Sequence, residues 1–188
     1  MQFKSDSLYH IYNRGNNKKR IFYHNDNYIF FLQKIRNHLK PHCHILAYCL
    51  MPNHFHLLIK TFDNDNGQEI SKAIGIILRS YTQVINKKQN SVGSVFQQKT
   101  KAKYLEATYI NYPFICFNYI HQNPLKAGIV NRLENWDYSS FKDYVGLRKG
   151  TLCDKELARQ ILDLPPNPLE FYKLAYLMIS DDLVSNFL

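Results

Sequence analysis

Two histidines separated by one residue are the first candidates for chemistry, because His54 and His56 flank Phe55 in a run of apolar residues. Alternate side chains of a β-strand point to the same face, so a strand here presents both imidazoles together and turns Phe55 toward the core. Two imidazoles on a rigid strand form half of a metal site and leave positions open for a substrate oxygen, as in catalytic metal centres. The alternative is two half-buried polar side chains, since the chain has eight histidines and repeats this spacing at His42 and His44. We expect no catalytic role for that second pair.

A second candidate group lies in a later segment with helical spacing. Tyr119 and Asn123 are four residues apart, so they share one face of a helix, whereas His121 lies on a different face. Tyr119 offers a hydroxyl, and the side-chain carbonyl of Asn123 can complete a metal shell of oxygen and nitrogen ligands. Taken alone, Tyr119 is one of 14 tyrosines, and most tyrosines in proteins are packing residues with a solvated hydroxyl.

The elements that must position these residues follow from the hydrophobic pattern. Period-two and buried runs predict strands, and apolar residues spaced by three or four predict helices. The predicted order is a strand at 8–12, a helix at 27–39, strands at 42–51 and 54–61, a helix at 67–88, a strand at 96–105 and a helix at 112–123. This order is typical of an α+β fold, a ferredoxin-like split β-α-β sandwich with an antiparallel sheet.

Local signals predict where the helices begin and end. We expect Asp26 to cap the first helix and Asn111 to cap the last one, because their side chains accept hydrogen bonds from free backbone N–H groups. Pro41 should stop the first helix. Pro124 and Gly128 should end the last helix.

The composition favours a soluble protein with one main domain. We predict that residues 1–148 form this domain and that residues 149–188 form a helical C-terminal extension. No run approaches the ~18 apolar residues of a membrane span, and the N-terminus lacks the apolar core of a signal peptide. The four cysteines form no C-x-x-C pair, so we expect buried thiols rather than a zinc ribbon. The sequence therefore indicates a cytoplasmic protein with no membrane partner.

The positive charge is concentrated in the main domain. The net charge of the chain is +9, and residues 1–150 hold 21 basic and 9 acidic residues. Such a surface favours a polyanionic partner, because phosphate binding releases counterions, although a solvated basic surface is the alternative. The candidate phosphate-binding residues are Arg14, Lys18, Lys19, Arg20, Lys99, Lys101 and Lys103.

Together, in order, the motifs resemble those of the HUH single-tyrosine transposases, the small enzymes of insertion sequences, and of the REP-associated tyrosine transposases. The resemblance runs from about residue 8 to residue 146. It is carried by the segments Tyr-His-Ile-Tyr-Asn-Arg at 9–14, Leu-Met-Pro-Asn-His-Phe-His-Leu-Leu at 50–58, Val-Phe-Gln-Gln-Lys at 95–99, 119–128, and Trp-Asp-Tyr-Ser-Ser-Phe at 136–141. One departure is Gln98-Lys99, where relatives often carry an arginine after the Phe-Gln pair.

The resemblance implies roles for the candidate residues. It makes residues 1–148 the catalytic domain, with His54, His56 and Asn123 as ligands of a divalent metal, Mg²⁺ or Mn²⁺, and Tyr119 as the nucleophile. The implied reaction cleaves and rejoins single-stranded DNA at hairpin sites through a 5′-phosphotyrosine link. Family members of this type act as homodimers or as monomers.

Two other functions are compatible with the sequence. The first is a relative that binds nucleic acid without catalysis, although the two histidines and the tyrosine are all present. The second is a hydrolase that uses metal-bound water at His54 and His56, in which case no link between protein and DNA would form.

Overall fold

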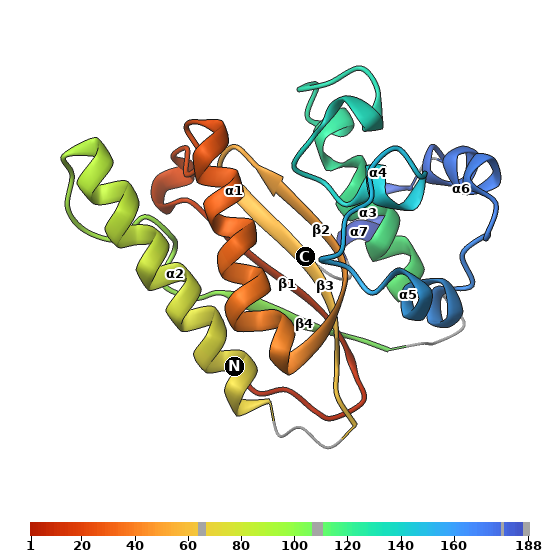
Figure 1. Cartoon of the computed structure of the whole chain (residues 1–188), viewed down its shortest axis with the longest axis horizontal. Helices are drawn as coiled ribbons and strands as arrows, with labels where there is room; N and C mark the ends of the chain where they lie inside the picture. Colours follow the sequence, from red (N-terminus) through yellow and green to blue (C-terminus); the bar gives the residue numbers. More distant parts are fainter. Residues whose placement is uncertain (64–66, 107–110, 178, 186–188) are drawn as a thin grey trace.

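The fold is built on one sheet of four antiparallel strands, β1 (Leu8–Arg14), β2 (Cys43–Met51), β3 (His54–Thr61) and β4 (Lys101–Leu105). The structure is a computed structural model that describes residues 1–63, 67–106, 111–177 and 179–185. The strands lie in the order β2-β3-β1-β4 (Figure 1). The predicted α+β fold with an antiparallel ferredoxin-like sheet is therefore confirmed.

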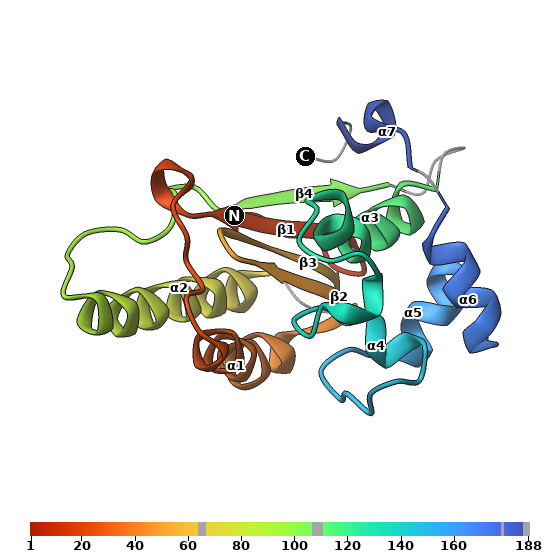
Figure 2. The same cartoon turned by 90° about the horizontal axis from the view of Figure 1, so that it is seen from above.

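Helices cover both faces of this sheet. The helices α1 (Asn25–Lys34) and α2 (Gln68–Gln89) lie side by side on one face, and α3 (Tyr112–Lys126) lies on the other (Figure 2). Two neighbouring residues of β3 show this division: the ring of Phe55 lies 5.1 Å from that of Phe31 in α1, and the ring of His56 lies 5.6 Å from that of Tyr119 in α3. The alternation predicted for the His-Phe-His segment thus turns Phe55 toward the core under α1 and His56 toward α3.

An aromatic cluster fills the space between the sheet and the first two helices. Phe22, Phe31, Phe55, Tyr81 and Phe96 are all buried, with several of their rings in edge contact. The hydroxyl of Tyr81 donates a hydrogen bond of 2.7 Å to the carbonyl of Ile21, so its burial leaves no unsatisfied polar group. This cluster anchors the sheet on the side away from His54 and His56.

Several predicted element boundaries were wrong. The first helix is capped at His24 rather than by Asp26, because Oδ1 of Asn27 accepts the backbone N–H of His24 at 3.1 Å. The fourth strand begins at Lys101 rather than near residue 96, since Phe96 makes only an isolated bridge to Gly15.

The end of α3 agrees with the prediction at Gly128, which follows the C-cap Ala127 with a φ of 65°, but differs from it at Pro124. Pro124 lies inside the helix, which continues to Lys126 although a proline loses its backbone N–H bond and crowds the carbonyl of Ile120. The N–H of Ala127 still bonds the carbonyl of Asn123 at 2.9 Å. The predicted cap at the other end is confirmed, as the side chain of Asn111 accepts the N–H of Phe114 at 3.2 Å.

The C-terminal segment is helical, as predicted. It contains α5 (Lys155–Leu162), α6 (Pro168–Ala175) and the short α7 (Asp181–Ser185), and it follows the short α4 (Phe141–Tyr144). Asp154 joins it to the sheet, because its N–H bonds the carbonyl of Ile45 at 2.8 Å and its carboxylate lies 2.9 Å from Nδ1 of His44. The boundary at residue 148 remains a prediction.

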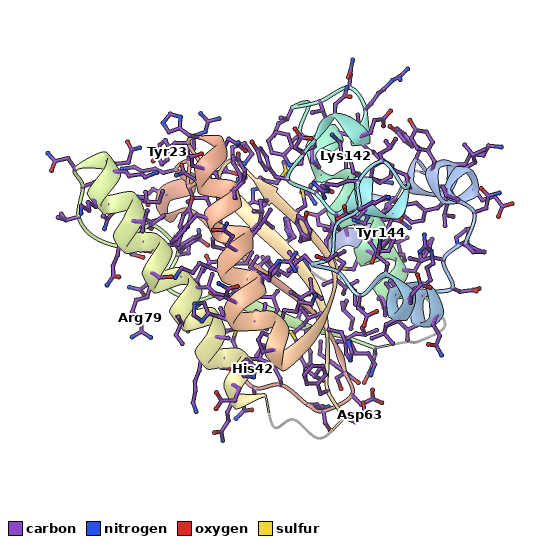
Figure 3. The ribbon with its side chains drawn as sticks, in the orientation of Figure 1. Tyr23, His42, Asp63, Arg79, Lys142 and Tyr144 are labelled. Atoms are coloured by element: carbon purple, nitrogen blue, oxygen red, sulfur yellow. The ribbon has the colours of Figure 1, made fainter. Side chains whose placement is uncertain are left out.

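The second histidine pair lies away from the first. His42 sits at the end of the two-helix layer opposite to Tyr23 (Figure 3), and β2 pairs its residue Cys43 with Thr61, at the far end of the hairpin from His54. His44 is held by Asp154, so this histidine has a structural role. All four cysteines are buried and free, as predicted. Within the described part of the chain, no helix has the length and apolar character needed to cross a membrane.

Arg148 ties the segment after α3 to the sheet. Its guanidinium forms two hydrogen bonds with Asp143, at 2.6 and 3.0 Å, and one of 2.9 Å with the hydroxyl of Tyr48. It also donates to the carbonyls of Asp137 and Ser139, both at 2.6 Å. The Asp143 side chain is only 1% exposed, so its charge depends on this partner.

We therefore expect Arg148→Ala to lower the free energy of unfolding by about 3 kcal/mol, because it leaves a buried carboxylate without its counter-ion. Urea denaturation measures this loss. The matched control is Lys149→Ala, which removes an exposed positive charge one residue away. Equal stability of the two variants would contradict the role assigned to Arg148.

Candidate active site

The register of the sheet places the site residues on the face covered by α3. Residues opposite one another in antiparallel strands share a face. On β1, Tyr12 pairs with His56 and Arg14 pairs with His54, and Tyr12 also pairs with Lys101 of β4. The two histidines, an aromatic ring and two cationic side chains therefore meet on one face of three adjacent strands.

Helix α3 brings Tyr119 and Asn123 over these histidines. The rings of Tyr119 and His56 are nearly perpendicular, at 82°, with centroids 5.6 Å apart. Asn123 is buried, and its Nδ2 donates to the carbonyl of Tyr119 at 2.9 Å, while its side chain also hydrogen-bonds His54 and the hydroxyl of Tyr119. The four residues singled out for chemistry are thus brought together within one chain.

These residues line a pocket of about 460 Å³ that opens to the surface. Its polar character comes from imidazole, amide, phenol and cationic groups. The lining residues are Tyr12, Asn13, Arg14, His54, His56, Gln97, Lys99, Lys101, Tyr119 and Asn123.

The two histidines are neutral at physiological pH. Burial lowers the pKa of His54 to about 4. A hydrogen bond that the Asn123 side chain accepts from the imidazole opposes this shift, and the charge of Arg14 adds to it. Burial also lowers the pKa of His56 well below its usual range, and the neighbouring imidazoles of His10 and His54 contribute. Neutral imidazoles have the lone pair that metal coordination requires.

The donor set fits a divalent metal ion. Nε2 of His56 is buried and has no hydrogen-bond partner, although buried polar atoms in proteins are nearly always paired. A metal ion bound by His54 and by the side-chain oxygen of Asn123 would also give this nitrogen of His56 a partner. No cluster of three or more His, Cys, Asp or Glu residues suited to a metal occurs among the residues described. Two imidazoles and one amide oxygen would leave positions open on a bound ion, as in a catalytic rather than a structural site.

Tyr119 is a protonated phenol at neutral pH. Burial raises its pKa, and the hydrogen bond from Asn123 opposes that shift. A phenol of this kind is a weak nucleophile until its proton is removed or the electrophile is activated.

The basic residues fall into two groups. Arg14, Lys99 and Lys101 line the pocket, and Lys103 lies on the same face of β4, opposite His10. The other three are exposed on the turn that follows β1 and do not line the pocket. They are Lys18, Lys19 and Arg20.

This basic turn is packed on the hairpin that carries the histidines. The N–H of Gly15 bonds the carbonyl of Asn53, and the N–H of Ile21 bonds the carbonyl of Pro52, both at 2.8 Å. A Cβ at Gly15 would lie 2.0 Å from the carbonyl oxygen of Lys19, so only glycine fits there. The turn therefore holds its cations at the edge of the site.

Sequence reasoning missed four residues of the site. Tyr12, Asn13 and Gln97 line the pocket, and Nε2 of His10 lies 2.8 Å from Nδ1 of His56. The alternation of the first strand puts His10, Tyr12 and Arg14 on one face, but only the pairing of β1 with β3 shows that this face meets the histidines.

Comparison with known proteins assigns the family. The family model of the IS200-like transposases matches residues 3–123, which contain both histidines, Tyr119 and Asn123. The chain belongs to the IS200-like transposase family. This confirms the family resemblance seen in the sequence, and it places this transposase among DNA-cleaving enzymes.

Two relatives are consistent with this assignment. The transposase is 26% identical over 128 residues to a protein of Haemophilus influenzae described as a REP-associated tyrosine transposase, covering 59% of this chain and 69% of the relative. Its fold matches the structure of a REP-associated tyrosine transposase bound to a REP hairpin, with a TM-score of 0.62 at 19% identity. That match covers 78% of this chain and 82% of the other.

Proposed function

We propose that this transposase cleaves and rejoins single-stranded DNA at hairpin sites, with Tyr119 as nucleophile. The observation that carries the proposal is that Tyr119 lies against His56 of its own chain, in a pocket whose other walls carry Arg14, Lys99 and Lys101. A phosphate bound among these cations would lie beside both the phenol and the imidazoles. Because the nucleophile and the histidines come from one chain, this arrangement favours cleavage by a monomer, although a homodimer remains compatible with it.

His54, His56 and Asn123 would hold the metal ion, Mg²⁺ or Mn²⁺, which when bound would withdraw charge from a non-bridging oxygen of the scissile phosphate. Both ions suit phosphate chemistry and an open set of imidazole and oxygen ligands. The protein contributes neutral imidazoles on a rigid hairpin and an amide held by α3.

The chemical step conserves the phosphodiester bond energy. The hydroxyl oxygen of Tyr119 forms a bond to phosphorus as its proton passes to solvent water. The bond from phosphorus to the 3′ oxygen breaks, and that oxygen takes a proton from solvent water. The products are a 5′-phosphotyrosine and a free 3′-hydroxyl. Attack by a 3′-hydroxyl on the phosphotyrosine reverses these changes and rejoins the DNA. No nucleoside triphosphate is therefore consumed.

The chemistry of the surface supports a hairpin substrate. The solved relative is a complex with a REP hairpin, and the basic residues of this chain lie both inside the pocket and on the adjacent turn. Single-stranded nucleic acid is commonly held by cations that follow its backbone and by aromatic rings that stack on bases. Tyr12 supplies such a ring in the pocket.

Charge reversal tests the basic turn. We expect Lys18→Glu with Lys19→Glu to weaken hairpin binding and to reduce the slope of log affinity against log salt by about 1.4 to 1.8, as for two lost phosphate contacts. Fluorescence anisotropy over a salt series measures this slope. The matched control is Lys72→Glu with Arg79→Glu on α2, which covers the face of the sheet opposite to α3. The side chain of Arg79 points outward there (Figure 3). A slope unchanged in the first variant, or equally reduced in both, would place the phosphate contacts elsewhere.

A denaturing gel separates the proposal from its two alternatives. A labelled hairpin oligonucleotide should migrate with the protein after denaturation if Tyr119 forms the covalent link. A hydrolase would release cut DNA without the link, and a binding protein without catalysis would release intact DNA.

A further inference from the structure

Each of the two candidate histidine ligands has a hydrogen-bond partner at its Nδ1 nitrogen. Nδ1 of His54 lies 2.6 Å from Oδ1 of Asn53, and Nδ1 of His56 lies 2.8 Å from Nε2 of His10. The partner of each imidazole decides which of its nitrogens carries the proton, and only the unprotonated nitrogen can bind a metal.

For His54 the direction of this hydrogen bond is fixed by Asn53. The amide orientation of Asn53 is set by its Nδ2, which donates to the carbonyl of Lys18 at 3.3 Å. Its Oδ1, which only accepts, therefore faces the imidazole. With this oxygen 2.6 Å away, Nδ1 of His54 is the nitrogen placed to donate, and the Nδ1–H tautomer has a lone pair on Nε2.

For His56 the direction follows from the environment of the ring. His10 is fully buried, and its ring stacks on that of His56 with centroids 5.0 Å apart. If His10 donated, the proton of neutral His56 would lie on Nε2, and the result would be a buried N–H without an acceptor. If His56 donates, Nε2 has a lone pair directed at the proposed metal site.

We propose that His10 and Asn53 are positioning residues that hold His56 and His54 as Nδ1–H tautomers, with both Nε2 lone pairs available to the metal. This inference rests on the proposed metal-dependent function. The two hydrogen-bond acceptors differ: an imidazole nitrogen of His10 accepts from His56, and the amide oxygen of Asn53 accepts from His54. Loss of such a second layer of hydrogen bonds typically weakens metal affinity by about 10–100-fold.

The first test needs no substitution. Long-range ¹H–¹⁵N correlation spectra of metal-free protein with ¹⁵N-labelled histidine report which ring nitrogen carries the proton. We expect both His54 and His56 to carry it on Nδ1. A proton on Nε2 of His56 or of His54 in the wild-type protein would overturn the proposal.

The second test measures Mn²⁺ affinity by titration calorimetry. His10→Phe keeps an aromatic ring but removes the acceptor, so we expect Mn²⁺ binding about 10–100-fold weaker and a shift of the His56 proton toward Nε2. His10→Gln keeps an acceptor and should restore most of the affinity and the Nδ1–H tautomer. Thermal unfolding shows whether each variant is folded. If His10→Phe does not fold, the proposal is tested by the wild-type spectra and by the Mn²⁺ affinity and tautomer of His10→Gln.

The outcomes separate this inference from the function on which it rests. If His56→Ala binds Mn²⁺ as tightly as wild type, the metal role of the histidines is wrong. If His56→Ala abolishes binding but His10→Phe leaves affinity and tautomer unchanged, the metal role stands and the role of His10 is rejected.

Discussion

Tyr119→Phe should reduce covalent attachment of hairpin DNA by a factor on the order of 10⁴ or more, because it removes the only atom of the side chain that can bond to phosphorus. The phenyl ring keeps the contact with His56 and the packing of α3, so folding and hairpin binding should change little. A denaturing gel measures the covalent product, and anisotropy measures binding of the uncut hairpin.

The matched control is Tyr112→Phe, which makes the same change at the start of the same helix, outside the residues that line the pocket. This variant should retain wild-type attachment. Persistent adducts with Tyr119→Phe would reject Tyr119 as the nucleophile. Loss of adducts in both variants would point to a general effect on α3.

The second large effect is expected from the histidine pair. His54→Ala with His56→Ala should abolish cleavage in Mg²⁺ or Mn²⁺, because two of the three proposed ligands are removed, and the loss should be comparable to that of Tyr119→Phe. Cleavage of a labelled hairpin over a Mn²⁺ series measures the effect. Hairpin binding through Lys18, Lys19 and Arg20 should persist.

The chain offers its own control for this variant. His42→Ala with His44→Ala has the same spacing and the same two substitutions at the opposite end of the hairpin. It removes the contact of His44 with Asp154 and should lower stability without abolishing cleavage. Unchanged cleavage in the His54 and His56 variant would exclude the metal role of that pair.

Much of this fold was predictable because local patterns and tertiary structure agree. The alternation around Phe55 placed the two histidines on one face, and the spacing of four residues placed Tyr119 and Asn123 on one face of α3. Each prediction needs only the period of one element. That the two faces meet was indicated only by the order of the family motifs.

What the sequence did not predict depends on neighbours distant in the chain. His10 supports His56 only because β1 lies beside β3 in a register that no local pattern encodes. The same holds at element ends. The Asn27 side chain favours a cap at His24 over Asp26, and α3 continues through Pro124 because the helix is packed against β2 and β3.

The C-terminal segment is less separable from the rest of the molecule than its position suggests. Gln122 lies beside Asn123 on α3, is buried, and donates its side-chain amide to the carbonyls of Ala175 and Leu177, each at 2.8 Å. Lys126, one turn further on, reaches the carbonyl of Ile179 at 3.1 Å. Shortening the protein to residue 148 would remove both hydrogen-bond acceptors of Gln122 and expose the side of α3 that packs against this segment. The hydrogen bonds to Ala175, Leu177 and Ile179 therefore help to hold the helix on which Tyr119 and Asn123 lie.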